Sequence, residues 1–461
     1  MTTKTNNGGG DAPMPGDVVF RGRALLGGQV RPATVVVRDG RITSVDDTGS
    51  GVTGRGEPVV ELAEDEVLLP GVVDSHVHVN EPGRTHWEGF ETATRAAAAG
   101  GVTTIIDMPL NSIPPTVDLP ALGVKRAAAD GQVYVDVGFW GGAVPSSLGH
   151  LAELHDAGVF GFKCFLLPSG VEEFAPLTSA ELDTAMAEVA GFDGLLIVHA
   201  EDAATIAAAG ACSGPDYADF LRSRPHEAED IAIVGILELA RKHGTRVHVV
   251  HLSSAHALDV LRQARADGVR VTVETCPHYL TLSAERIGAG QTQCKCCPPI
   301  RDEANQARLW EALAEGVVDA VVSDHSPSPP ELKLLDTGDF GAAWGGISSL
   351  QLGLSLIWTE ARQRGHDLGD VLGWMSRAPV TVAGVPHKGS IEVGYDADFA
   401  VFAPDERFVV DADRLQHRHP LTPYDGRELS GVVRQTWLRG RKIVGEDGFA
   451  PAAGRLLSRG E

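Results

Sequence analysis

Residues 68–78 read Leu-Leu-Pro-Gly-Val-Val-Asp-Ser-His-Val-His, and this stretch decides the fold of the chain. The run is apolar and β-branched, which is typical of a strand covered on both faces, and it closes with His76 and His78. Because side chains alternate along a strand, both imidazoles lie on one face. Such a pair suits a borderline divalent cation such as zinc, with further ligands from elsewhere in the fold. The alternative is two strand histidines that only make hydrogen bonds.

Seven further apolar runs follow, and each leads into a helix-like stretch. Regular alternation of strand and helix implies parallel strands, so eight units predict a TIM-like (β/α)8 barrel. A doubly wound open sheet is the alternative, but no Gly-x-Gly-x-x-Gly turn opens the first helix. The predicted strands are 72–79, 102–108, 133–139, 159–165, 195–199, 247–251, 269–275 and 318–322. The helix-like stretches include 88–99, 228–243, 255–266 and 305–315.

Short Val-rich segments flank this alternating middle. Residues 17–47 contain a strong hairpin signal at Asp39 and Gly40. Residues 389–410 and 432–445 have similar short Val-rich runs. Neither end is large enough to be stable alone, so we expect them to pair into one small domain. The predicted division is a disordered tail (1–16), a β-sandwich domain (17–68 with 384–461) and a catalytic barrel (69–383).

Composition narrows the class of protein. The chain has 461 residues, 43% of them hydrophobic, so it can bury a large core. A net charge of −23 argues against nucleic acid or an anionic membrane as a partner. The first 16 residues are polar and glycine-rich, and no run approaches about 18 apolar residues, so we expect a cytoplasmic protein. Six cysteines are too few for a disulfide scaffold; we interpret the group at 294–297 as reduced thiols, not as a structural zinc site.

A barrel gathers the carboxyl ends of its strands at one rim, where its chemistry lies. Any single histidine there could be a strand-end residue capped by a carbonyl group, but their joint placement predicts a metal site. Five predicted strands deliver potential ligands to this rim: His76 with His78, Lys163, His199, His251 and Asp324.

Lys163 is unusual because it stands between Phe162 and Cys164 in an apolar strand. A buried ammonium is costly and cannot bind a cation. Carbon dioxide can convert the neutral amine into a carbamate, whose two oxygens could bridge two metals.

Three neighbours are expected to serve other roles. His248, three residues before His251, should face the opposite side of its strand, in the helix layer. His325 should likewise be structural, and Asp74 should orient a ligand instead of binding metal.

The chain resembles the cyclic amidohydrolases of the amidohydrolase superfamily over nearly its whole length. The motifs are residues 71–78, 161–165, 198–201, 250–253 and 323–325. The resemblance implies that His76, His78 and Asp324 bind one metal and that His199 and His251 bind another. Lys163 would be the bridging N6-carboxylysine. The implied metals are zinc first, with cobalt, manganese or iron as alternatives, and the implied assembly is a homo-oligomer, a tetramer or dimer.

Within this family, residues 80–90, 108–112, 294–301 and 343–347 most resemble members that open the hydantoin ring of allantoin to allantoate in purine catabolism. Dihydroorotases usually have an arginine, which holds the substrate carboxylate, where this chain has Asn80. Dihydropyrimidinases have a tyrosine shortly after the lysine, where this chain has Leu-Leu-Pro-Ser at 166–169, so the oxyanion donor stays unassigned. A hydantoinase of broad specificity and a non-catalytic scaffold are the alternatives; the scaffold is disfavoured because all six ligand positions are filled.

The implied reaction is hydrolysis of a cyclic amide in a small ureide. Two bridged cations would lower the pKa of a shared water and polarise the carbonyl. Asp324 would accept the proton of that water and deliver it to the leaving ring nitrogen. The resemblance places substrate contacts near Cys297, Trp344 and Gly345. Asn111 could be a further polar contact or a loop-stabilising side chain.

Overall fold

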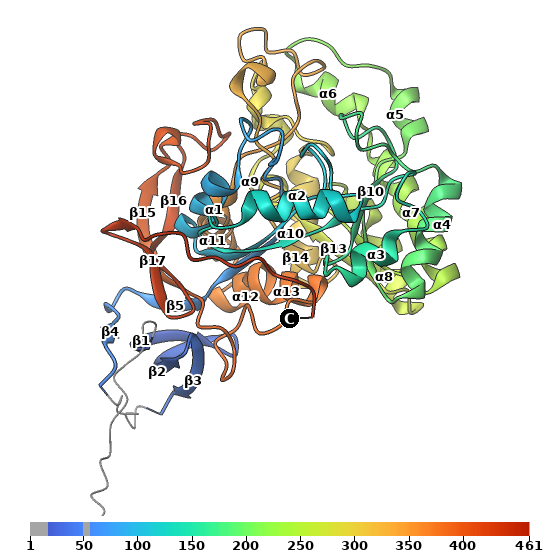
Figure 1. Cartoon of the computed structure of the whole chain (residues 1–461). Coiled ribbons are helices and arrows are strands. Elements are labelled where there is room, and N and C mark those ends of the chain that lie inside the picture. The colour runs from blue at the N-terminus through green and yellow to red at the C-terminus, as the bar shows by residue number, and fades with distance from the viewer. Residues whose placement is uncertain (1–16, 49–55, 461) are drawn as a thin grey trace, which may run out of the picture.

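The computed structural model describes residues 17–48 and 56–460, so the predicted tail lies outside the described residues. Parallel strands of two sheets, with orders β6-β7-β8 and β14-β13-β12-β11-β10-β9, form a barrel (Figure 1). Trp140 alone separates β8 from β9, and a parallel bridge from Val77 to His325 joins β6 to the chain just after β14. Because β8 and β9 together fill one position, the nine strands make eight positions that close into a ring. The predicted (β/α)8 barrel is therefore confirmed. The strands are β6 (Val72–Val77), β7 (Val102–Asp107), β8 (Asp136–Phe139), β9 (Gly141–Gly142), β10 (Phe162–Phe165), β11 (Leu195–His199), β12 (Arg246–Val249), β13 (Val271–Thr275) and β14 (Ala320–Val321).

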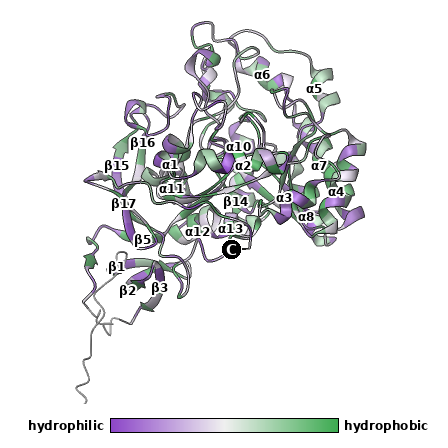
Figure 2. Cartoon of the chain, viewed as in Figure 1, coloured by the Kyte–Doolittle hydropathy of each residue, from purple (hydrophilic) through white to green (hydrophobic). Residues whose placement is uncertain are grey.

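Amphipathic helices cover the barrel, with apolar and polar residues mixed along helices such as α4 and α7 (Figure 2). On α7 the buried residues include Ile233, Ile236 and Ala240, which recur every three to four positions and form one face. Gly244 ends α7 in the left-handed conformation that glycine adopts without strain. The helices are α1 (Phe90–Ala99), α2 (Leu119–Ala129), α3 (Leu151–Asp156), α4 (Ser179–Gly191), α5 (Ala203–Ala209), α6 (Tyr217–Ser223), α7 (His226–His243), α8 (Leu258–Ala266), α9 (Pro277–Thr281), α10 (Glu303–Ala314), α11 (Gly353–Gln363), α12 (Leu368–Leu372) and α13 (Ala378–Ala383).

The two ends of the chain share a second, nine-stranded sheet beside the barrel (Figure 1). The strands predicted to form a β-sandwich are joined by hydrogen bonds into one continuous sheet, because β5 pairs with β1 on one side and with β15 on the other. The predicted hairpin is confirmed: Asp39 and Gly40 both have positive φ, as a two-residue turn between β2 and β3 requires. The boundaries at 68/69 and 383/384 stay predictions. The strands are β1 (Val18–Leu26), β2 (Gln29–Arg38), β3 (Arg41–Asp46), β4 (Val59–Glu61), β5 (Val67–Pro70), β15 (Phe399–Val409), β16 (Glu428–Leu438), β17 (Arg441–Gly445) and β18 (Gly448–Phe449).

A buried ionic cluster joins this sheet to the bottom of the barrel. The ammonium group of Lys388 lies 2.6 Å from carboxylate oxygens of both Asp136, at the start of β8, and Asp398, just before β15. Asp396 lies 2.8 Å from the same nitrogen, and Arg439 donates to Asp136. Burial alone would lower the pKa of Lys388, but the three carboxylates hold that pKa above its ordinary value. Lys388 thus stays charged and ties the two parts of the fold together.

In the part of the chain that the structure describes, no helix combines the length and the apolar character that crossing a membrane requires.

Candidate metal centre

The structure brings the six predicted metal ligands together at one rim. They line a single cavity of about 220 Å³. Lys163 lies within β10, and the other five lie in the last two residues of their strands or up to three residues beyond them. The four predicted substrate contacts line the same cavity. The two sets are His76, His78, Lys163, His199, His251 and Asp324, and Asn111, Cys297, Trp344 and Gly345.

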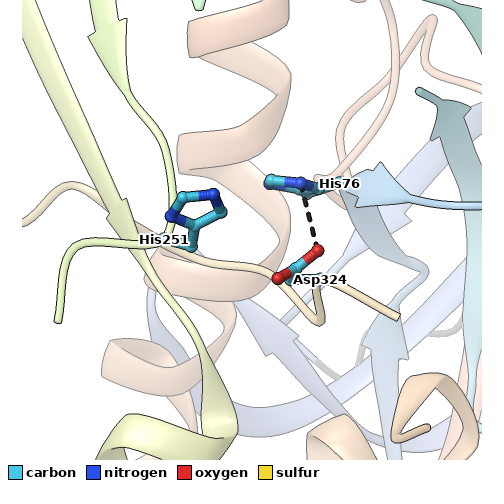
Figure 3. A group of neighbouring side chains, drawn as sticks. All are labelled: His76, His251 and Asp324. Carbon is cyan, nitrogen blue, oxygen red and sulfur yellow. Dashed lines mark ion pairs between the residues drawn. The ribbon is translucent and has the colours of Figure 1, made fainter. Parts of the chain in front are cut away.

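One cluster of possible ligands is centred on Asp324. Its Oδ1 atom lies 3.2 Å from Nε2 of His76 and 3.4 Å from Nε2 of His78. Figure 3 shows the carboxylate of Asp324 directed towards His76, with His251 on the other side. His251 and Asp324 both have φ near +40°, a conformation that non-glycine residues rarely adopt. The chain therefore leaves both strands in sharp turns that direct these side chains into the cavity.

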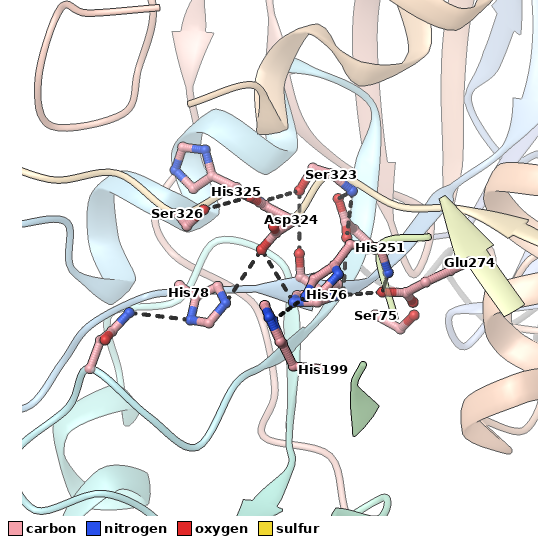
Figure 4. A network of polar contacts seen from close by, with 12 residues as sticks. Ser75, His76, His78, His199, His251, Glu274, Ser323, Asp324, His325 and Ser326 are labelled. Atoms are coloured by element: carbon pink, nitrogen blue, oxygen red, sulfur yellow. Dashed lines mark hydrogen bonds and ion pairs between the residues drawn. The ribbon is translucent and has the colours of Figure 1, made fainter. Parts of the chain in front are cut away.

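A second cluster pairs His199 with His251. Nδ1 of His199 faces Nε2 of His251 at 3.0 Å (Figure 4). The Nε2–H of His199 donates to Glu201 at 2.7 Å, which leaves the Nδ1 lone pair directed at His251. Burial lowers the pKa of both histidines, so both are neutral imidazoles, the form that binds metals.

Lys163 interacts electrostatically with both clusters. The side chain is buried, and its ammonium group is 5.1 Å from the centre of the Phe165 ring. Burial lowers the pKa of Lys163 to about 8, although Asp324 and Glu274 oppose this effect. Its positive charge in turn helps to lower the pKa of His78 and of His251, one from each cluster.

These groups fit divalent cations. Nε2 of His76 and Nδ1 of His251 are buried, and neither has a hydrogen-bond partner among the described residues. Burial would raise the pKa of Asp324, but the neighbouring histidines hold it well below its usual range, so the group is a carboxylate. Unpaired imidazole nitrogens around a carboxylate are unfavourable when buried alone and are typical of zinc and similar metals.

Glu274, on β13, is a site residue that the sequence interpretation missed. Its carboxylate accepts a short hydrogen bond from Nδ1 of His76, and its other oxygen lies 2.9 Å from Nε2 of His248. A carboxylate behind a metal-binding histidine fixes which ring nitrogen is free. The available signal was a lone acidic residue in a strand that is otherwise uncharged.

His248 therefore lies inside the barrel, and its predicted place in the helix layer is wrong. It also contacts Thr272 Oγ1 at 2.8 Å. The prediction assumed that strand alternation continues to His251. In the structure β12 ends at Val249 and the chain turns at His251, so both histidines reach the interior.

Asp74 and His325 have the structural roles that were expected. Asp74 accepts hydrogen bonds from the backbone N–H groups of His76 and Ser323 at 3.1 Å, and burial raises its pKa to about 6. His325 contacts Glu88 at 3.1 Å and accepts from the Ser349 N–H. Neither residue lines the cavity.

The cavity wall offers few free charges. Arg224 donates to Glu201 at 2.6 Å, and the Lys295 ammonium group donates to the carbonyl groups of Gly341 and Ala343. Asn80 does not line the cavity, because its amide donates to the Pro327 carbonyl group instead. The position that an arginine occupies in dihydroorotases is therefore turned away from the cavity.

Two smaller predictions concern Asn111 and the cysteines. The side-chain amide of Asn111 is buried and lies 3.5 Å from Nδ1 of His78, on the side away from Asp324. This contact leaves both of its proposed roles, substrate binding and loop support, open. None of the six cysteines, all of which are among the described residues, forms a disulfide, and the interpretation of residues 294–297 as thiols without zinc stays a prediction.

Comparison with known proteins places these features in context. Residues 67–443 match the model of the amidohydrolase family. The chain is 58% identical to an allantoinase of Streptomyces avermitilis over 93% of its length and 95% of the relative. It is 45% identical to an allantoinase of Saccharomyces cerevisiae, again over 93% and 95% of the two chains. The solved structure of an L-hydantoinase (dihydropyrimidinase) from Arthrobacter aurescens superposes with a TM-score of 0.89 at 30% identity, covering 97% of this chain and all of that one.

Proposed function

This chain belongs to the amidohydrolase family, and from that membership we propose that it hydrolyses the hydantoin ring of allantoin to allantoate. The observation that carries the proposal is the allantoinase relative that is 58% identical along 93% of the chain. The convergence of three histidine-bearing strands, Lys163 and Asp324 on one cavity supports the same chemistry.

We propose that the cavity holds two divalent cations, zinc first, with cobalt, manganese or iron as alternatives. His76, His78 and Asp324 would hold one cation, and His199 and His251 the other. When bound, the two cations would lower the pKa of a water molecule and polarise the scissile carbonyl. The facing nitrogen atoms and the unpaired nitrogen atoms described above support this assignment.

Lys163 would join both cations as a carbamate. With a pKa of about 8, roughly a tenth of this amine is neutral near pH 7 and can attack carbon dioxide. The new N–C bond forms as the nitrogen releases one proton, and the product carries a negative charge on two oxygens. The reaction thus replaces the positive charge of a buried ammonium, which is unfavourable, with a negative charge that two cations would stabilise.

Asp324 is proposed as the proton carrier. It is held in the carboxylate form, so it can accept a proton from the attacking water. Its position at the centre of the His76 and His78 cluster also lets it deliver that proton to the ring nitrogen as the C–N bond breaks. One residue thereby acts as general base and then as general acid.

The cavity walls favour a small neutral ring as the substrate. Trp344 and Cys297 would contact the ring, together with Asn111 and the backbone near Gly345. The cationic groups of Arg224 and Lys295 are already paired, and Asn80 is turned away, so a carboxylated substrate has no free partner there.

Two further expectations about the protein stay predictions. We propose that it works in the cytoplasm as a homo-oligomer, a dimer or tetramer. Sedimentation of the purified protein tests the assembly state.

A panel of cyclic substrates tests the proposed function. Purified holoenzyme is assayed with allantoin, hydantoin, dihydrouracil and dihydroorotate, and Asp324→Asn serves as the inactive control. We expect kcat/KM to be highest for allantoin. A higher value for hydantoin or dihydrouracil would favour the hydantoinase alternative, and no hydrolysis of any substrate by protein with bound metal would favour the scaffold.

A further inference from the structure

A second group of possible ligands lies against the metal centre and shares Asp324 with it. One ligand atom each of Cys276, His278 and Asp324 lies within 4.8 Å of the others, and all three side chains are buried. Cys276 directly follows β13, and His278 lies on α9. The proposed hydrolysis uses neither of these two residues, and neither lines the cavity.

His278 gives an independent sign that something is bound there. The residue is fully buried, and neither ring nitrogen has a hydrogen-bond partner among the described residues. An imidazole always has one donor or acceptor function on each nitrogen, and leaving both unpaired in the interior costs free energy. A buried histidine of this kind calls for a bound ion or an ordered water.

We propose that Cys276, His278 and Asp324 form a third cation position that takes thiophilic divalent cations such as Zn²⁺ or Cd²⁺ and inhibits the enzyme. Thiolate and imidazole ligands favour these cations over Mg²⁺ and Ca²⁺, which prefer oxygen. Three protein ligands leave a fourth, tetrahedral position for water. When the cation binds, it displaces the thiol proton of Cys276, and this proton is released to solvent.

Inhibition follows from the shared carboxylate, and this part of the inference rests on the proposed function. Asp324 Oδ1 already lies within 3.4 Å of His76 and His78, and a third cation would bind the same side chain. Asp324 is also the proposed proton carrier, so a carboxylate held by the third cation would no longer be positioned to carry the proton. Asp324 lines the cavity, so we expect an ion to enter the position from that side.

Cadmium titration of the holoenzyme tests this site. Protein that carries two equivalents of metal is titrated with Cd²⁺ while bound metal, the ultraviolet thiolate-to-cadmium charge-transfer band and allantoin turnover are recorded. We expect uptake of a third equivalent, with the band growing as turnover falls. The Cys276→Ala and His278→Gln variants should lose the third equivalent and the band, whereas Cys164→Ala, another buried thiol, should keep both.

Several outcomes would overturn the proposal. One is cadmium uptake without the band and with release of the resident metal, which would mean exchange in the catalytic centre. Another is loss of the band in Cys297→Ala but not in Cys276→Ala. A third is no uptake beyond two equivalents, which would leave a buried water as the partner of His278. If Cys276→Ala unfolds, His278→Gln still decides the question. Because uptake and the band do not require allantoin hydrolysis, failure of the site and failure of the proposed function are distinguishable.

Discussion

Glu274 on β13 accepts a hydrogen bond from Nδ1 of His76 on β6, so the first proposed metal ligand of the chain is oriented by a carboxylate from a strand that only β14 separates from its own. This contact leaves Nε2 of His76 directed at Asp324. The same carboxylate binds His248 and receives the backbone N–H of His251. One buried side chain therefore supports both clusters of ligands.

The Glu274→Gln substitution should weaken metal binding by about 10- to 100-fold, because an amide orients the imidazole of His76 less strongly than a carboxylate does. Competition with a chelator measures the effect, and turnover at saturating metal shows how much activity returns. Thr272→Val is the matched control, since it removes the other partner of His248 on the same strand. Unchanged affinity in Glu274→Gln would mean that this carboxylate does not orient the ligand.

Much of the barrel could be predicted from the sequence, because parallel strands covered on both faces are apolar throughout. The same pattern located the ends of β6 and β11, where His76 and His199 lie in the cavity. Contacts between strands could not be predicted in this way. The pairing of Glu274 with His76 depends on the closed barrel, and the inward position of His248 depends on a backbone turn at His251 that alternation does not reveal.

Replacement of Lys163 by Ala should remove most bound metal and nearly all activity. The carbamate is the only proposed ligand that both cations would share, so its loss affects both. Metal analysis of the purified variant, alongside kcat, measures this. If the variant keeps a full two equivalents of metal, Lys163 is not the bridge.

The Asp324→Ala substitution should abolish turnover even where some metal remains. The alanine can neither accept the proton of water nor return it to the ring nitrogen, so kcat should fall by at least about 10²-fold. Steady-state kinetics with matched metal content separate this effect from metal loss. Turnover near that of the unmodified enzyme would exclude Asp324 as the proton carrier.

Trp344 offers a test of the substrate side of the cavity. Its ring packs against that of Trp87 at 5.0 Å between centroids and closes over Gly170. The Trp344→Leu substitution should raise KM for allantoin by about tenfold, equivalent to a loss of about 1.4 kcal/mol in binding. We expect a much smaller change in kcat, because no hydrogen bond or ring contact among the described residues joins Trp344 to a proposed metal ligand. A fall in kcat with KM unchanged would contradict this role.

The Lys388 cluster predicts how the two parts of the fold depend on each other. The Lys388→Met substitution removes the cation that Asp136, Asp396 and Asp398 share, two of which are buried, and should lower the free energy of unfolding by about 3–5 kcal/mol. Because the folded-state pKa of Lys388 is raised, its contribution is complete below the unfolded pKa of about 10.4 and is lost as pH rises through the higher folded value. Urea unfolding at pH 7 and above pH 10 measures both effects. A difference between the two proteins that grows at high pH would contradict the assignment.

Stepwise metal loading tests the central claim most directly. Metal-free protein is titrated with Zn²⁺ in the presence of bicarbonate, and allantoate formation is measured at each step. If two cations share the site, allantoate formation should rise to a plateau at two equivalents per chain and fall only beyond them. Full activity without metal or at one equivalent, or no allantoate at two, would contradict a binuclear allantoin-hydrolysing centre.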